Sequence, residues 1–263
     1  MNAIRLQDYQ NAQIDLDVPT PLFRDTERQH AVYWLGTQAK AAFRCNVYLI
    51  VDGEEAILVD PGSKAAFPQI RRRVAQILPS ERITGMILCH QDPDVAASFV
   101  DWLALDPAIK VYTTLRTQVL LPHYGCSGYA FVDVGRNPLL RLSSGAELRF
   151  IEAPFLHFPG AFTTYDNACR FLFSGDIWGA ISAEWRLVLS DFAGHAVKMD
   201  MFHIDYMASN IAARGFLRRL EGLDIQAIVP QHGSIIPAAM VAQAKEYLEQ
   251  LECGLDVVYP ELR

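Results

Sequence analysis

The 263-residue sequence has little cysteine, little positive charge and no long apolar run. Its five cysteines are odd in number, widely spaced and without a CxxC pair, which argues against a disulfide framework or a cysteine-rich zinc module. The formal net charge of −7 argues against binding nucleic acid through its phosphates, because such binding needs a basic face. No segment resembles a signal peptide or a membrane span. We therefore expect a cytoplasmic protein with no nucleic-acid or membrane partner.

What the sequence does contain is enough apolar material for a large core. It is 51% hydrophobic and 20% charged, and no low-complexity or Pro/Gly/Ser-rich linker divides it. We expect one domain over residues 1–263, with residues 1–30 as an amino-terminal extension. The only basic run is Arg71-Arg72-Arg73, which falls on a predicted helix, and we expect it to form a solvated face.

Short strands joined by tight turns dominate the first half of the sequence, and helices alternate with strands in the second. The stretch 46–62, NVYLIVDGEEAILVDPG, predicts two strands around an Asp-Gly turn. Further strands are predicted at 83–90, 110–114, 147–155, 169–176 and 225–232, and helices at about 65–78, 95–105, 198–221 and 238–253. Hairpins followed by alternating elements predict an αββα sandwich rather than a doubly wound parallel sheet.

Four of the predicted strands end in a polar group that can bind a proton or a metal. The endings are ILCHQDPD (87–94), APFLH (153–157), LFSGD (172–176) and IVPQH (228–232). Ionisable groups directly after apolar runs are costly unless they are paired or bound to a metal. Imidazole and carboxylate are the expected ligands of zinc, iron or manganese. The candidate ligands are His90, Asp92, Asp94, His157, Asp176 and His232.

The first of these endings has a local geometry suited to binding. Pro93 disfavours helical backbone at Asp92, so the segment should stay extended until the next helix begins. In an extended segment His90, Asp92 and Asp94 project to one side. Six such groups can hold two cations that share one carboxylate.

Each candidate also has an ordinary structural interpretation. Asp94 could be the N-cap of the helix that follows it, and Asp176 could be a turn aspartate. His157 or His232 alone would more often be a hydrogen-bonded core histidine. These interpretations explain one residue each, whereas a shared metal site explains why all four strands end in the same way.

With these motifs the sequence resembles the metallo-β-lactamase superfamily, whose signature is H-x-[H/E/D]-x-D-H followed by later His, Asp and His ligands. Within it, the sequence is most similar to the flavodiiron proteins and the oxygen-binding diiron proteins. The similarity runs from about residue 30 to 253 and includes NVYLIVDGEEAILVDPG, LHFPGAF, LFSGDIWG and PQHGSII. It implies an αββα fold with metals at one edge of the two sheets.

The resemblance also implies a ligand set. His90, Asp92 and His157 would hold one metal, Asp94 and His232 the other, and Asp176 would bridge them. Hydrolytic zinc members have histidine where this chain has Asp92, and the diiron branch has a carboxylate. A more anionic site suits iron or manganese better than a nitrogen-rich one, so the expected cofactor is a pair of iron ions, with zinc or manganese as alternatives.

Val95 departs from the family pattern, which often has a ligating histidine at this place. Valine cannot coordinate, so the second metal would have an open position for water, O2 or NO, or would bind too weakly to fill. In the first case Val95→His should tighten the second metal. The remaining histidines could supply a replacement ligand, although exposed or hydrogen-bonded roles are favoured for each: His30, His123, His195 and His203.

The function implied is binding, and possible reduction, of O2 or NO at a non-haem diiron centre. Flavodiiron proteins carry a flavodoxin-like domain, and this chain ends at Arg263 without one, so no flavin is expected in it. Electrons would then come from a separate flavoprotein or rubredoxin-like donor, or the protein would act as an oxygen sensor. The resemblance further implies a homodimer. Apolar neighbours of the metals are expected to include Phe158, Trp178 and Tyr206, with Phe155 and Phe162 as further candidates.

Two alternatives remain open at this point. A dinuclear zinc hydrolase could activate water against an ester, thioester, lactone or phosphodiester. A non-catalytic module whose site has decayed would explain Val95, but it would not explain why the other six ligand types are retained.

Overall fold

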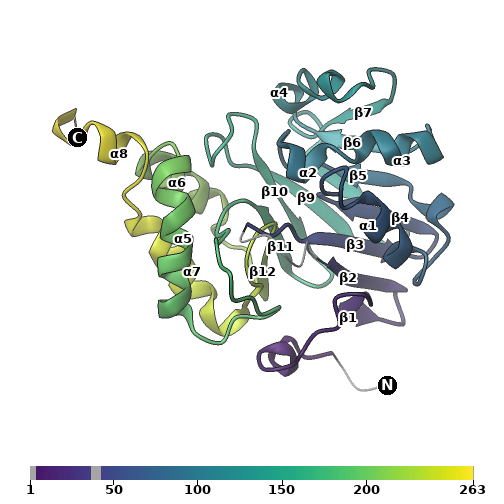
Figure 1. Cartoon of the computed structure of the whole chain (residues 1–263), viewed down its shortest axis with the longest axis horizontal. Coiled ribbons are helices and arrows are strands. Elements are labelled where there is room, and N and C mark those ends of the chain that lie inside the picture. The colour runs from purple at the N-terminus through teal and green to yellow at the C-terminus, as the bar shows by residue number, and fades with distance from the viewer. Residues whose placement is uncertain (1–3, 37–42, 263) are drawn as a thin grey trace.

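The computed structural model describes residues 4–36 and 43–262, so the first three residues of the expected amino-terminal extension lie outside it. Two β-sheets face each other, and helices cover the outer face of each sheet (Figure 1). This arrangement confirms the predicted αββα sandwich.

The first sheet contains seven strands in the order of the sequence. They are β1 (Thr20–Asp25), β2 (His30–Gly36), β3 (Val47–Asp52), β4 (Glu55–Val59), β5 (Gly85–Ile87), β6 (Lys110–Thr113) and β7 (Ala130–Asp133). Strands β1 to β4 are antiparallel, and β4 to β7 are parallel. Because β1 pairs with β2, part of the expected amino-terminal extension is an edge strand of this sheet.

The second sheet contains six strands in the order β13-β12-β11-β10-β9-β8. They are β8 (Leu139–Arg141), β9 (Glu147–Glu152), β10 (Phe162–Asp166), β11 (Phe171–Gly175), β12 (Ala227–Pro230) and β13 (Ile236–Pro237). Strands β11 and β12 pair in parallel, which brings their carboxyl ends to the same edge.

Most of the helices lie against the outer faces of the two sheets (Figure 1). They are α1 (Phe67–Val74), α2 (Pro93–Ala96), α3 (Phe99–Leu105), α4 (Leu115–Gln118), α5 (Phe192–Tyr206), α6 (Asn210–Arg219), α7 (Val241–Gln250) and α8 (Leu255–Val258). Short 3-10 turns are η1 (Leu6–Tyr9), η2 (Ser80–Arg82), η3 (Leu121–Tyr124), η4 (Ala238–Met240) and η5 (Pro260–Leu262). Helices α1 to α3 cover the first sheet, and α5 to α7 cover the second (Figure 1). Helix α8 projects beyond α6 at the carboxyl-terminal end (Figure 1).

Alternation of side chains along the strands produces three apolar layers. In β3, Tyr48 and Ile50 point into the layer between the sheets, whereas Val47 and Leu49 point into the layer beneath α1 to α3. The third layer lies between the second sheet and α5 to α7. The central strands of each sheet are therefore buried on both faces, which explains why β3 and β12, for example, are almost continuously apolar.

Two predicted helices are each broken into two. The helix expected at 95–105 is α2 followed by α3, and the region 198–221 contains the end of α5 and all of α6. The break between α5 and α6 includes Ser209, whose side chain accepts a hydrogen bond from Ala212 N and so caps α6. Apolar periodicity continues across both breaks, so it could not reveal them.

The basic run on α1 does not form a uniformly solvated face as predicted. Arg71 and Arg72 are exposed, but Arg73 is only 1% exposed, and its Nη1 donates a hydrogen bond to the carbonyl of Leu35. Gly36 follows with φ +111°, and a Cβ at this position would overlap the Arg73 guanidinium. The prediction was therefore wrong for Arg73, which anchors α1 to the end of β2.

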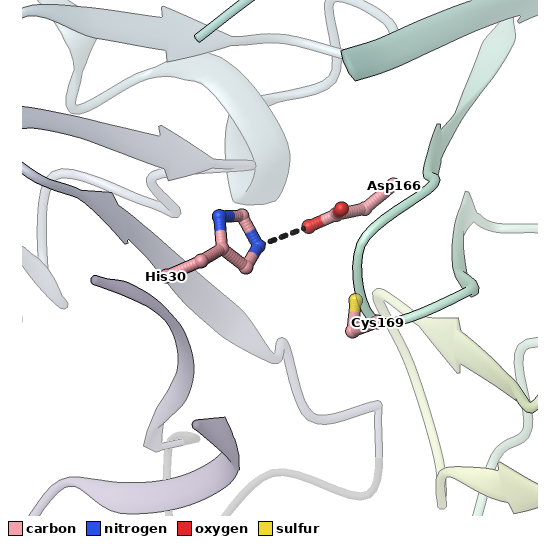
Figure 2. Close-up of side chains that lie close together, drawn as sticks. All are labelled: His30, Asp166 and Cys169. Atoms are coloured by element: carbon pink, nitrogen blue, oxygen red, sulfur yellow. Dashed lines mark hydrogen bonds and ion pairs between the residues drawn. The ribbon is translucent and has the colours of Figure 1, made fainter. Parts of the chain in front are cut away.

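A buried histidine links the two sheets at one end of the sandwich. His30, at the start of β2, has one ring nitrogen 2.7 Å from Asp52 Oδ2 of β3. Its other ring nitrogen lies 2.9 Å from Asp166 Oδ2 of β10, in the opposite sheet, with Cys169 nearby (Figure 2). The two carboxylates raise the pKa of His30 although burial alone would lower it. We name these residues, His30, Asp52 and Asp166, the histidine link.

Among the described residues, no helix has the length and apolar character that a bilayer crossing requires.

Candidate metal centre

The six predicted ligands come together at the edge of the sandwich opposite the histidine link. His90 and Asp92 follow β5, and Asp94 lies in the first turn of α2. The others follow strands of the second sheet: His157 after β9, Asp176 after β11 and His232 after β12. The cluster therefore takes ligands from both sheets.

Asp176 lies at the centre of this cluster and is 4% exposed. Its Oδ2 lies 2.8 Å from His157 Nε2 and 3.2 Å from His90 Nε2. Its Oδ1 lies 3.5 Å from His232 Nε2. The two oxygens of one carboxylate thus face two different sets of imidazoles, as a bridge between two cations requires.

The other two carboxylates complete two separate groups. Asp92 Oδ2 lies 3.3 Å from His157 Nε2 and 3.6 Å from His90 Nε2. Asp94 Oδ2 lies 3.3 Å from His232 Nε2. We name the group with His90, Asp92 and His157 the first position and the group with Asp94 and His232 the second position, with Asp176 common to both.

Two buried atoms of this cluster lack a well-formed hydrogen bond. Among the described residues, His90 Nε2 and Asp176 Oδ1 make no hydrogen bond of acceptable geometry, although each lies within 3.5 Å of an oppositely charged group. A buried polar atom without a partner is costly, and an ion would remove that cost. In the histidine link, by contrast, each ring nitrogen of His30 has a carboxylate partner. The histidine link and the cluster around Asp176 both contain potential metal ligands, but they differ in whether all of their buried polar atoms are hydrogen-bonded.

The charges in the cluster depend strongly on one another. Burial alone would lower the pKa of His157, but the carboxylates of Asp176 and Asp92 raise it to about 9. Burial alone would raise the pKa of Asp92 and Asp176, and hydrogen bonds and charges from the histidines hold both below their usual value. The raised pKa values of His90 and His157 favour protons on these two imidazoles in the metal-free chain, and divalent cations would replace these protons.

Neighbouring groups orient the ligands. His232 Nδ1 donates to the carbonyl of Arg44 at 2.9 Å, which leaves its Nε2 facing the cluster. Cys89 Sγ lies 3.1 Å from His90 Nδ1, and the Cys89 backbone N–H donates to the buried Asp60 carboxylate. Burial raises the pKa of Asp60 to about 6. These contacts fix the imidazole orientations before any ion binds.

The structure removes two of the ordinary interpretations. The N-cap of α2 is Asp92 rather than Asp94, and it makes no side-chain capping hydrogen bond. Asp94 instead faces His232. Asp176 does lie in the turn that follows β11, but it is buried among three histidines, which an ordinary turn aspartate would not be.

None of the remaining histidines lies at the place of the missing family ligand. His30 belongs to the histidine link, and His123 is exposed in η3. His203 accepts a hydrogen bond from the Trp178 backbone N–H, and His195 is buried in α5. Burial lowers the pKa of both His195 and His203 to about 4.

Some aromatic neighbours differ from those predicted. The Tyr206 ring contacts His157 edge-on at 5.9 Å between centroids, as expected of a neighbour of the metals. Trp178 instead packs against Phe216, and its Nε1 donates to Ala244 O in the layer beneath α5 to α7. The side chain of Phe158 lies close to Gly160.

Three residues that the sequence reasoning missed lie next to the predicted ligands. The Phe43 ring stacks on His232 with centroids 3.5 Å apart, and Phe202 meets His157 edge-on at 5.8 Å. Cys45 Sγ lies 3.5 Å from Asp94 Oδ2. No local pattern marks these residues, because their position depends on pairing between distant segments.

Known proteins share this fold and this sequence pattern. A family described as "ODP family beta lactamase" matches residues 43–233. Structures of a chemotaxis sensor ODP, one of its peroxy diiron species and one of its apo state from T. denticola, are 29% identical to this chain. Each match covers 93% of this chain. It covers 100% of the sensor chain in the peroxy diiron structure and 98% in the apo structure, with TM-scores of 0.81 and 0.82 respectively.

Two curated flavoproteins are also similar. Diflavin flavoprotein A 1 of Synechocystis sp. is 28% identical over 73% of this chain, and an anaerobic nitric oxide reductase flavorubredoxin of Enterobacter sp. is 26% identical over 54%. The chain spans about a third of the length of each, 34% and 30% respectively. The family match alone covers well over half of the chain, and we conclude that the chain belongs to the ODP family of β-lactamase-like proteins.

Proposed function

We propose that this chain is a non-haem diiron protein that binds O2 or NO. One iron would be held at the first position and the other at the second, with Asp176 between them. The observation that carries this proposal is the Asp176 carboxylate, whose two oxygens face two separate histidine groups. Its unpartnered Oδ1 and the unpartnered His90 Nε2 fit bound cations.

The residues around the irons have distinct tasks. When bound, a ferrous pair would supply the electrons that stabilise a diatomic gas. Asp92, Asp94 and Asp176 contribute three negative charges, which favour the higher oxidation state. Phe202 and Tyr206 of α5 place apolar rings beside His157, which helps to exclude water from that side.

Iron is favoured over zinc for two reasons. The carboxylate of Asp92 stands where hydrolytic zinc members have an imidazole, and an oxygen-rich set suits iron or manganese. The similar chemotaxis sensor, which this chain covers completely, has been described with a peroxy diiron species. We therefore do not propose the zinc hydrolase.

The same comparison supports a sensor that binds a gas rather than an enzyme that turns it over. The flavoproteins match over only a third of their length, so their reductase activity and electron donors are not carried over. If the chain does reduce O2 or NO, a separate flavoprotein or rubredoxin-like protein would supply the electrons. All five cysteines are free thiols, which supports a reducing compartment such as the cytoplasm.

Removing the bridge tests the proposal directly. We expect wild-type protein reconstituted anaerobically with Fe²⁺ to hold two irons per chain by elemental analysis, and Asp176→Asn to lose most of both. The loss is expected because the amide is neutral and binds cations weakly. Ferrous wild-type protein should also change its absorption spectrum when exposed to O2 or NO, whereas zinc-loaded protein should not.

A matched control is Asp8→Asn, since Asp8 is exposed in η1. It should leave both the metal content and the spectral change unaltered. Full iron content in Asp176→Asn would show that the bridge is assigned wrongly, and a spectrally inert diferrous wild type would overturn gas binding.

A further inference from the structure

Cys45 lies where the second position lacks a ligand. At the first position, four side chains offer donor atoms: His90, Asp92, His157 and the shared Asp176. At the second, the predicted set contains only Asp94, His232 and the shared Asp176. Cys45 Sγ, the Asp94 carboxylate and a His232 ring nitrogen all lie within 4.8 Å of one another. A sulfur ligand would give both positions four protein donors.

The spacing of these atoms suits a common cation. Cys45 Sγ lies 3.5 Å from Asp94 Oδ2, and His232 Nε2 lies 3.3 Å from the same oxygen. In tetrahedral sites a metal–sulfur bond is about 2.3 Å long, and a metal–nitrogen or metal–oxygen bond is about 2.0 Å long. With these bond lengths, a sulfur and an oxygen ligand lie about 3.5 Å apart, and a nitrogen and an oxygen ligand lie about 3.3 Å apart. The two separations from Asp94 Oδ2 therefore already have the values that coordination would impose.

Cys45 is held in place from several sides. It forms an isolated β-bridge with His232, and the backbone N–H of Asn46 donates to Gln231 O at 2.6 Å. The Asn46 side chain donates to the carbonyls of Pro230 and Gly233, each at 3.0 Å. The segment carrying Cys45 is thus fixed to the loop that carries His232, and the thiol is 8% exposed.

A second observation shows that this side of the cluster is prepared for an ion. Asp176 Oδ1, the oxygen that faces His232, is buried and has no hydrogen-bond partner among the described residues. A thiol that only donated a hydrogen bond to Asp94 would leave this oxygen unsatisfied. An ion between Asp94, His232 and Asp176 would satisfy it.

We propose that Cys45 binds the metal of the second position as a thiolate. This inference rests on the proposed dinuclear site and adds a soft, anionic ligand to it. Metal binding releases the thiol proton to solvent, and the sulfur electron pair forms the new bond. The second position would then have a nitrogen, two oxygens and a sulfur as protein ligands, and would differ in chemistry from the nitrogen- and oxygen-bound first position.

Cobalt(II) is a suitable probe, because a thiolate bound to it gives an intense sulfur-to-metal charge-transfer band in the near ultraviolet. We expect metal-free wild-type protein to bind two Co²⁺ and to develop this band as the second position fills. Cys45→Ser should lack the band and should keep the ligand-field bands of the first position. It should bind the second Co²⁺ at least about 10-fold more weakly, since losing a partner that only orients a ligand already costs that much.

The control is Cys253→Ser, since Cys253 is buried in the layer beneath α5 to α7. It should keep the charge-transfer band. Thiol alkylation followed by mass spectrometry gives an independent readout: Cys45 should be protected in cobalt-loaded protein compared with the metal-free chain.

The outcomes separate the two proposals. If wild-type protein binds two Co²⁺ without the band, or if Cys45→Ser keeps the band, Cys45 is not a ligand although the dinuclear site stands. If wild-type protein binds no Co²⁺, the proposed function fails as well.

Discussion

At the residue scale, the side chain of Val95 packs in the hydrophobic core and does not face the candidate metal centre. From the sequence, position 95 looks like a vacant ligand place, because a histidine is often found there in the family. In the structure Val95 is 0% exposed and belongs to the apolar layer beneath α1 to α3. Its neighbour Asp94, by contrast, faces His232.

Val95→His should therefore destabilise the fold rather than tighten the second metal. An imidazole in this layer would lose its hydration without gaining a partner, and we expect the free energy of unfolding to fall by about 3 kcal/mol. Denaturant unfolding of metal-free protein measures this change. Val197→His, at an exposed position of α5, is the control and should change stability by no more than about 0.5 kcal/mol. Unchanged stability together with tighter metal binding would restore the original expectation.

The six ligand candidates could be predicted because each follows an apolar run, where an ionisable side chain is unexpected. Cys45 could not be found in this way. Its neighbour Asn46 links it to the loop of His232, and a contact between residues so far apart in the sequence leaves no local signal. The same holds for Phe43, which stacks on His232.

At the scale of elements, α1 presents neighbouring arginines with opposite environments. Arg72 is exposed, whereas Arg73 is buried and donates to the carbonyl of Leu35 at the end of β2. The sequence reasoning assigned both to a solvated face, because charge alone does not tell which arginine of a run faces the sheet.

This pair allows a matched comparison. Arg73→Ala should lower the free energy of unfolding by about 3 kcal/mol, since it empties buried volume and leaves the Leu35 carbonyl without this donor. Arg72→Ala should change it by no more than about 0.5 kcal/mol. Thermal and denaturant unfolding of the two variants side by side measure the difference. Equal effects would mean that Arg73 does not anchor α1.

The element types were largely predictable, and their boundaries were less so. Strands β3 to β6, β9, β11 and β12 lie within the predicted runs, because apolar and β-branched residues dominate them. The edge strands β1, β7, β8 and β13 were missed, since edge strands carry weaker apolar patterns. Strand β2 was missed as well, although six of its seven residues are buried. Strand β10 was missed because FTTYD, its sequence, is only half apolar, although all five residues are buried.

At the scale of the whole molecule, the histidine link contributes to the pH dependence of the free energy of unfolding. The pKa of His30 is raised above its ordinary value of about 6.5. The folded chain therefore binds this proton more tightly than the unfolded chain does. The stabilisation that protonated His30 gives to the folded chain is fully present below about pH 6.5. It is lost as the pH rises through the raised pKa of His30 in the folded chain.

His30→Gln should accordingly lower the free energy of unfolding by about 3 kcal/mol at pH 6, because it leaves two buried carboxylates without their cationic partner. The difference in unfolding free energy between wild type and variant should narrow as the pH rises above 6.5. Denaturant unfolding across this range measures it, and His123→Gln, at an exposed histidine, should show no such difference. If the difference in unfolding free energy between wild type and His30→Gln stays constant with pH, His30 is neutral in the folded chain.

The histidine link and the candidate metal centre lie at opposite ends of the same strands. Asp166 pairs with Phe171 at the start of β11, whereas Asp176 follows the other end of that strand. The two sheets are thus linked at both ends of these strands, by the histidine link at one end and by the cluster around Asp176 at the other. If the chain is the sensor that we propose, α5 is the helix in direct contact with its candidate metal centre, because the Phe202 and Tyr206 rings lie edge-on to His157.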